Sequence, residues 1–548
     1  MLTSNLLKKS NKLVIIFCIC LNPILWYDSF FESRKNRFFA YPSFSSDEYH
    51  YIARAKQVWN GNSVTSISRD SYNDGIQSIV ENIFFSIGRI FQSSNSLFYM
   101  FFIAIAVISS IAAVTSFFFL VSKLTKTNNK IGNQIIILIF LLIMIWVESY
   151  KIETNPTNTG FERWPTPSLH YLIINLLFII LLNSSYSYKD TISLVALLSS
   201  SVYLYFYTWQ ITLTISCLFL ILNLVRKKSK NVGILSTSII ISLVIGIPYY
   251  RNLLQTRENR DNLSNIFFER QMGLINSNSF NSSKLLVIGC LILLLVLKVR
   301  QKFTLSFQLI TGCIVLAGII VLNQNLLTGY VIQPGHYYWY FIAPYIYLVS
   351  IIVIIELISS RILKFTVIPL ALILLFSYFN LANNTKNYVP EDEYNRLGTD
   401  ILTSLPRNTY SLNNNIDTFL SINANNSPAL IQWMIYYPNS LGTATENCMI
   451  QTLWHVHSLE KNHFSMVMRE NELCKTIEKT LGYNYLFSQI DQWRLNPSDK
   501  FSKWAESNEV SAILAAGSLS EVQTLLLKDQ WPKRFSRNGL SVYSKIEL

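Results

Sequence analysis

Charged residues are scarce in this chain. They make up 14% of its 548 residues, against roughly 25% in an average soluble domain, and 51% of the residues are hydrophobic. The shortage is greatest in the part before about residue 381, where long apolar runs alternate with short basic segments. The composition therefore predicts a transmembrane domain over residues 1–381 and a soluble domain over residues 382–548.

Several sequence patterns that would indicate other protein classes are also absent. None of the seven cysteines has the spacing of a zinc or haem site, so no metal-binding cluster is predicted. The formal net charge is +13, but no basic stripe with interleaved aromatic residues lies outside the apolar runs. We therefore expect no nucleic-acid partner. No small-residue cleavage site follows the first apolar run, which favours an uncleaved signal-anchor.

The apolar runs predict a polytopic α-helical membrane protein with about eleven transmembrane helices. Dense basic clusters, such as 226–230, separate alternate runs. The positive-inside rule therefore predicts a cytoplasmic N-terminus and an extracytoplasmic C-terminal domain. The predicted spans are 12–29, 97–121, 133–148, 168–184, 190–207, 210–225, 233–249, 284–298, 304–322, 338–358 and 363–380.

This orientation places every long loop on the outer side, together with the C-terminal domain. The loops are 30–96, 149–167, 250–283 and 323–337. In the C-terminal domain, strand-like and helix-like segments alternate, which predicts a small α/β domain. The strand-like segments are Thr409–Leu412, Tyr485–Phe487, Ser511–Ala515 and Gly539–Ile546, and the helix-like ones are 466–480 and 519–528.

Two cysteines, Cys448 and Cys474, lie in the C-terminal domain, and the other five lie in apolar runs. Since the predicted compartment of the domain is oxidising, we expect these two to form a disulfide.

The first outer loop carries an acidic pair, Asp47 and Glu48, directly after Ser45 and Ser46. The serines can cap a helix that starts near Asp47, and the helix dipole favours the carboxylates in its first turn. Capping alone would explain the pair. Its place just after the first membrane span gives a second interpretation, in which the carboxylates face a lipid-linked substrate.

The helix that this pair begins continues through Tyr51, Ala55 and Val58, which are spaced to face the bilayer or another helix. A second amphipathic segment follows at Ile76–Phe91, so we expect interfacial helices within residues 45–92.

The pattern Asp47-Glu48-x-x-Tyr51-x-x-x-Ala55 in a first outer loop resembles the integral-membrane glycosyltransferases of the GT-C superfamily. The resemblance implies that the loop carboxylate acts as a general base or as a ligand of substrate and metal, so a divalent metal is possible. It also implies a sugar donor linked to a polyprenyl phosphate. We assign catalysis to Asp47 and Glu48, and substrate binding to His50, Tyr51 and Arg54 of the same segment.

Three further outer segments contain candidate substrate-binding residues. Glu162 and Arg163 precede the fourth span, where a guanidinium could bind phosphate, although a surface ion pair is the competing interpretation. Gln324 could bind sugar hydroxyls and His336 could bind phosphate, although the aromatic residues beside His336 also fit an interfacial belt.

The last candidates, Tyr250 and Arg251, end a span, and Arg251 could reach a lipid phosphate.

The sequence thus favours a glycosyltransferase acting at the extracytoplasmic face on a lipid-linked donor, with membrane lipids around it. The acceptor is left open between glycan, lipid and protein. A transporter or flippase should carry ionisable residues in mid-span, and the apolar runs hold almost none. A polymerase of lipid-linked glycans and a noncatalytic assembly protein remain as alternatives.

Overall fold

The structure of the chain is a computed structural model, mostly helical with a small sheet near the C-terminus. The residues that it describes are 55–56, 58–59, 79–91, 95–125, 130–149, 165–267, 280–324, 334–357, 369–377, 405, 409–411, 441–471, 474–475, 477–478, 483–507, 510–516, 518–527, 530–537 and 540–545.

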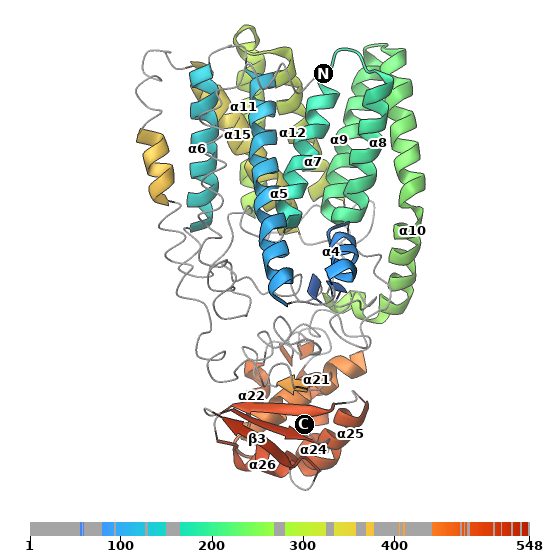
Figure 1. The fold of residues 1–548 in the computed structure, drawn as a ribbon, viewed down its shortest axis with the longest axis vertical. Helices are drawn as coiled ribbons and strands as arrows, with labels where there is room; N and C mark the ends of the chain where they lie inside the picture. The colour runs from blue at the N-terminus through green and yellow to red at the C-terminus, as the bar shows by residue number, and fades with distance from the viewer. Residues whose placement is uncertain are drawn as a thin grey trace.

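The first part of the described chain folds into a bundle of long helices (Figure 1). The helices are α4 (Ile79–Phe91), α5 (Asn95–Leu124), α6 (Lys130–Ser149), α7 (Pro165–Leu181), α8 (Tyr188–Leu204), α9 (Phe206–Val225), α10 (Ser229–Phe267), α11 (Phe280–Lys298), α12 (Leu305–Leu322), α14 (Pro334–Tyr337) and α15 (Ala343–Leu357). A 3-10 turn at Arg300–Lys302 joins α11 to α12, and a π-helical turn at Tyr338–Ile342 joins α14 to α15.

Five helical segments among the described residues are long and apolar enough to cross a bilayer, namely Leu97–Leu124, Phe206–Val225, Ser229–Arg251, Leu305–Leu322 and Tyr340–Leu357. Two shorter apolar segments, Gly132–Met144 and Ser168–Leu181, also coincide with predicted spans. The predicted membrane helices are therefore confirmed in part, while the count of about eleven stays a prediction.

The perimeter of the bundle is apolar. Ile240 and Ile247 on α10, and Leu291 and Leu294 on α11, are between 55% and 63% exposed. A soluble monomer rarely leaves so much contiguous apolar surface in water. Together with the length of the apolar helices, this perimeter indicates association with a membrane.

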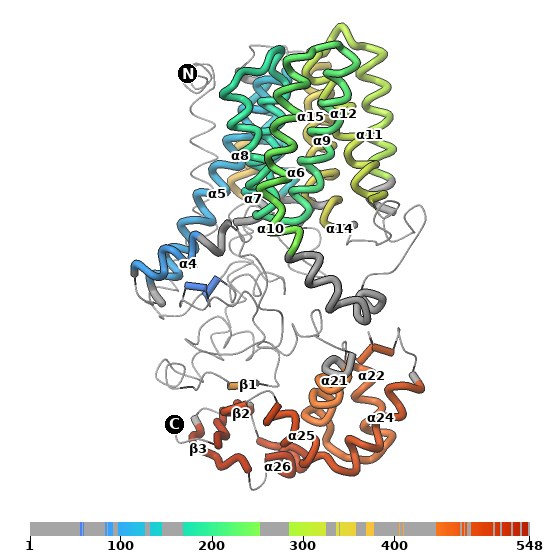
Figure 2. Tube along the Cα trace, turned by 90° about the vertical axis from the view of Figure 1, so that its right-hand side faces the viewer, coloured from blue at the N-terminus to red at the C-terminus, as the bar shows by residue number. Residues whose placement is uncertain are grey.

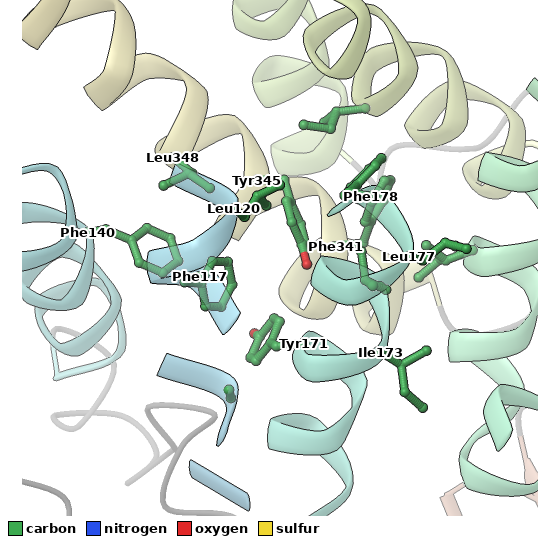
Figure 3. Packing of buried hydrophobic residues seen from close by; sticks show 14 of the residues in the cluster. Phe117, Leu120, Phe140, Tyr171, Ile173, Leu177, Phe178, Phe341, Tyr345 and Leu348 are labelled. Carbon is green, nitrogen blue, oxygen red and sulfur yellow. The ribbon is translucent and has the colours of Figure 1, made fainter. Parts of the chain in front are cut away.

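Aromatic rings from separate helices fill the centre of the bundle (Figure 3). The Tyr345 ring on α15 lies 5.8 Å from both Phe117 on α5 and Phe178 on α7. The Tyr345 hydroxyl donates to Oδ1 of Asn175 over 2.7 Å, and Nδ2 of Asn175 donates to the Ser116 hydroxyl over 2.8 Å. These bonds tie α5, α7 and α15 together, because a polar group buried in this core needs a partner.

The C-terminal part is a small α/β domain, as the sequence predicts. Its elements are β1 (Thr409–Ser411), α21 (Leu441–His455), α22 (Lys461–Glu470), α24 (Tyr483–Leu495), α25 (Pro497–Ser507), β2 (Ala512–Ala516), α26 (Glu521–Leu527), β3 (Lys533–Arg537) and β4 (Leu540–Ser544). The strands form one sheet in the order β1-β2-β4-β3. Strands β1 and β2 are parallel, and the other two pairs are antiparallel.

The predicted disulfide is confirmed. Cys448 on α21 is bonded to Cys474, with a Cα–Cα distance of 5.3 Å, and both residues are buried in the apolar core of the domain. The disulfide closes a loop of the chain that contains α22 and ties the end of this loop to α21.

Most of the predicted elements of this domain are confirmed, and one is wrong. Tyr485–Phe487 was predicted as a strand, but it lies inside α24. The buried residues of α24, Leu486, Ile490 and Trp493, recur at helical spacing, which a three-residue apolar run cannot reveal. Strand β3 and helices α21 and α25 were not predicted.

The domain lies beyond one end of the bundle, which we call the domain-proximal end (Figures 1 and 2). Helix α4 and the starts of α5, α7 and α9 lie at this end in both views, and α14 lies there in Figure 2.

Candidate functional site

Part of the sequence-predicted site lies outside the described residues. This applies to the first-loop residues Asp47, Glu48, His50, Tyr51 and Arg54 and to the pair Glu162 and Arg163. The structure describes the other four predicted residues, which are Tyr250, Arg251, Gln324 and His336. Among the described residues, no three or more His, Cys, Asp or Glu side chains are grouped as a metal site would require.

His336 lies in a tight aromatic cluster at the domain-proximal end of the bundle. Its ring stacks on Tyr207, with the centroids 4.5 Å apart and the planes at 16°. Its Nδ1 is hydrogen-bonded to the Tyr205 hydroxyl, and the Tyr340 ring meets it edge-on at 5.6 Å. We call His336, Tyr205, Tyr207 and Tyr340 the His336 cluster.

Tyr205 can reach His336 because it interrupts the helical conformation between α8 and α9. It is the one residue between the two helices, and its backbone is extended, with φ −164° and ψ 132°. Its N–H donates to the Ser201 carbonyl at the end of α8, and its carbonyl accepts from the Trp209 N–H in α9. One backbone hydrogen bond is thus made at each helix end, and the first turn of α9 presents its rings to α14.

The π-helical turn after His336 is explained in part by Pro344. In an α-helix, the Tyr340 carbonyl would accept from the N–H of residue 344, but proline has none. The Tyr340 carbonyl is instead bonded to Nε2 of His170 on α7 at 2.8 Å. The Ala343 N–H donates to the Tyr338 carbonyl five residues back, as in a π-turn. Such turns are often found at functional sites.

His170 also contacts the start of α9. Its Nδ1 lies 2.8 Å from the Thr208 hydroxyl, and the whole residue is 1% exposed. Since a carbonyl can only accept, Nε2 carries the proton toward Tyr340. In the neutral ring, Nδ1 then accepts from Thr208. His170 thus links α7 both to the start of α9, through Thr208, and to Tyr340 of the His336 cluster.

Tyr250 lies on the other side of the first turn of α9. Its ring is 4.9 Å from the Trp209 ring, and Gly246, one turn earlier on α10, leaves room for it to fold back against the helix. Arg251, the next residue, is exposed. Tyr250 and His336 are therefore on opposite flanks of one helix start, and the structure does not bring Arg251 against the His336 cluster.

Gln324 is half-buried and directly follows Asn323, which caps the C-terminus of α12. Helix α12, which Gln324 follows, contacts α14, the helix that contains His336.

The described part of the first loop is packed firmly onto the bundle. Ala55 and Val58 are fully buried, which confirms that this face of the predicted helix contacts protein. Trp59 packs on Phe84 of α4 and Phe98 of α5, with ring centroids 6.3 and 5.7 Å apart. The segment that follows Asp47 and Glu48 is thus held against α4 and α5.

Lys56 is a residue of this segment that the sequence did not single out. It is 1% exposed, and its Nζ lies 5.0 Å from the centre of the Phe98 ring and 5.8 Å from that of Tyr99. Burial lowers the pKa of the Lys56 ammonium from its usual 10.5 to about 7. The sequence carried no signal for this burial, because Lys56 directly follows Ala55 and so lies off the predicted helix face of Tyr51, Ala55 and Val58.

No protein-family model matches the chain, and no curated protein matches its sequence.

The His336 cluster combines groups that can exchange protons and bind oxygen-rich ligands. Imidazole changes its charge near neutral pH, and the phenol bonded to it can relay or hold a proton. The sequence predicted His336 as a site residue but not Tyr205, Tyr207, Tyr340 or His170. The only local signal for His170 was Pro344, which predicts an unpaired carbonyl at Tyr340 but not which residue satisfies it.

Proposed function

We propose that the chain is a polytopic membrane glycosyltransferase of the GT-C type. It transfers a sugar from a polyprenyl-phosphate-linked donor to an acceptor at the extracytoplasmic face, with inversion at the anomeric carbon. The observation that carries the proposal is a shared location. The His336 cluster and the packed segment that follows Asp47 and Glu48 both lie at the domain-proximal end of the bundle.

The proposal includes a topology of about eleven spans, with the N-terminus in the cytoplasm and the C-terminal domain outside. It is supported by the basic clusters of the sequence and by the Cys448–Cys474 disulfide, because disulfides persist in oxidising compartments.

In the proposed reaction, the acceptor hydroxyl attacks the anomeric carbon and its proton passes to the Asp47 carboxylate, with Glu48 as the second choice. The bond between the anomeric carbon and the phosphate oxygen breaks, and the lipid phosphate leaves. Arg163, Arg251 and His336 are the residues that would stabilise the charge on the leaving phosphate. A divalent metal held by the carboxylate pair would serve the same purpose.

A transporter or flippase is the competing function. It would need ionisable or helix-breaking residues in the middle of the bundle. Two buried polar residues there, Asn175 and Ser116, are neutral and hydrogen-bonded to each other. This pair favours an enzyme over a transporter.

The test is replacement of each carboxylate. We expect Asp47→Asn to lower transfer by about 10² to 10⁴, the usual cost of removing a positioned base, in protein that is folded and inserted. If Asp47 only capped a helix, asparagine would replace it with little effect. Transfer is measured as release of polyprenyl phosphate in membranes at matched protein levels. Asp74→Asn removes one charge from the same predicted loop and serves as control.

Glu48→Asn is measured beside it to rank the two carboxylates. Normal transfer by both variants would refute the catalytic assignment, and no release of polyprenyl phosphate by the unaltered chain would refute the proposed reaction class.

A further inference from the structure

His170 is a buried histidine that the proposed reaction does not use, yet both of its ring nitrogens are hydrogen-bonded. One bond goes to the Tyr340 carbonyl and the other to the Thr208 hydroxyl, each at 2.8 Å. The two partners lie 132 residues apart in the chain. Tyr340 belongs to the π-turn that follows His336, and Thr208 belongs to the start of α9, on which the His336 ring is stacked. We call these two segments the walls of the His336 cluster.

We propose that His170 is a positioning residue that holds the His336 ring in its stacked orientation and so determines its reactivity. The proposal rests on the proposed function only for the role of His336 in transfer. The placement of the His336 ring itself can be tested without any transfer reaction.

The first wall is the π-turn. Because Pro344 supplies no N–H, the Tyr340 carbonyl lacks the donor that an α-helix would give it and can accept from a partner outside its own helix. Nε2–H of His170 is that partner. Tyr340 is one helical turn beyond His336, and its ring touches both histidines, at 5.6 Å from His336 and 5.9 Å from His170. Loss of the His170 bond would therefore loosen the turn that carries His336.

The second wall is the start of α9. Thr208 directly follows Tyr207, on whose face the His336 ring is stacked. The hydroxyl of Thr208 is fixed by Nδ1 of His170 from the neighbouring helix α7. Through these two bonds, His170 sets the separation between the Tyr207 ring and the backbone that presents His336. The stacking of the two rings at 4.5 Å would weaken if this separation increased.

The protonation of His336 is sensitive to this geometry. Titratable groups against its ring include the phenols of Tyr205 and Tyr207 from the α8–α9 junction and of Tyr340 from its own helix. These phenols are uncharged near neutral pH. The hydrogen bond with Tyr205 and the stacking on Tyr207 contribute to proton uptake at His336, and both depend on where His170 holds the walls.

The experiment uses paired variants of the full chain in detergent. Thr208→Val keeps the size of the side chain but removes the hydroxyl, whereas Thr208→Ser keeps the hydroxyl. His170→Phe removes both bonds at once. The modification of His336 by diethyl pyrocarbonate is followed by mass spectrometry of its peptide from pH 5.5 to 8. This reagent attacks only the unprotonated ring, so the pH profile reports both exposure and protonation of His336.

We expect Thr208→Val and His170→Phe to change the rate of His336 modification at pH 7 by about threefold or more, as loss of a buried hydrogen bond between membrane helices allows. The midpoint of the pH profile should move with it. Thr208→Ser should behave as the unaltered chain. Tyr345→Phe removes a comparable buried bond, to Asn175, and should lower stability without changing the profile.

An unchanged His336 profile in both Thr208→Val and His170→Phe would overturn the proposal. A change of equal size in Tyr345→Phe would do the same, because the effect would then be general loosening of the bundle. If Asp47→Asn and Glu48→Asn both transferred normally, only the proposed reaction would be refuted. The modification rates of His336, and with them the positioning role of His170, would be unaffected.

Discussion

Replacement of Gly88 by alanine tests how the first outer loop is held in place. Gly88 lies in α4, where the helix crosses the backbone of residue 59. A Cβ atom at position 88 would lie 2.8 Å from the Trp59 Cα and closer still to the Trp59 carbonyl oxygen. Because both atoms belong to the backbone, no side-chain rotation can relieve the contact. The helix and the segment that contains Trp59 would have to separate.

Two opposing terms set the size of the effect. Alanine is favoured over glycine within a helix by about 0.5–1 kcal/mol. Overpacking of a well-packed contact costs about 1–3 kcal/mol. The Trp59 ring also lies against Phe84 and Phe98, so separation would weaken aromatic contacts as well. We therefore expect a net destabilisation of about 1–2 kcal/mol for Gly88→Ala.

Gly233 on α10 provides the matched control, because a Cβ atom there would meet nothing within 4 Å. Gly233→Ala should leave the melting temperature of the purified chain unchanged or raise it, whereas Gly88→Ala should lower it. Transfer should fall about tenfold or more in Gly88→Ala, because small displacements of catalytic groups are costly. A Gly88→Ala protein as stable as Gly233→Ala would show that α4 does not press on Trp59.

Two further outcomes follow from the described residues. Loss of the Cys448–Cys474 disulfide, by Cys448→Ser or by reduction, should cost about 3 kcal/mol of domain stability, as expected for a loop of this length, and should appear as a lower melting temperature of the C-terminal domain on thermal unfolding of the full chain. An unchanged transition on reduction would contradict it. Between pH 7 and 10.5 an unfolded Lys56 holds a proton that the folded residue has lost, so the unfolding free energy should rise with pH across this window. In Lys56→Met this part of the pH dependence should vanish, and a melting temperature that varies with pH as in the unaltered chain would exclude the effect.

The large features of this protein follow from its sequence. Apolar runs long enough to cross a bilayer form helices in the structure because a buried backbone must satisfy its hydrogen bonds locally. The spacing of Ala55 and Val58 indicated one buried face, and both are buried. The pair Cys448 and Cys474 followed from counting cysteines in the predicted oxidising compartment. Each of these inferences uses only composition or short periodicity.

The geometry of the candidate site was decided by the tertiary structure alone. His336 and Tyr205 are 131 residues apart in the sequence, and His170 and Tyr340 are 170 apart. Pro344 leaves the Tyr340 carbonyl without its usual donor, and the donor that the carbonyl has in the structure comes from another helix. Likewise, the apolar run Tyr485–Phe487 is compatible with strand or helix until its packing partners are known. Hydrophobicity and helix periodicity act over a few residues, whereas hydrogen bonds and ring contacts between helices depend on how the whole bundle packs.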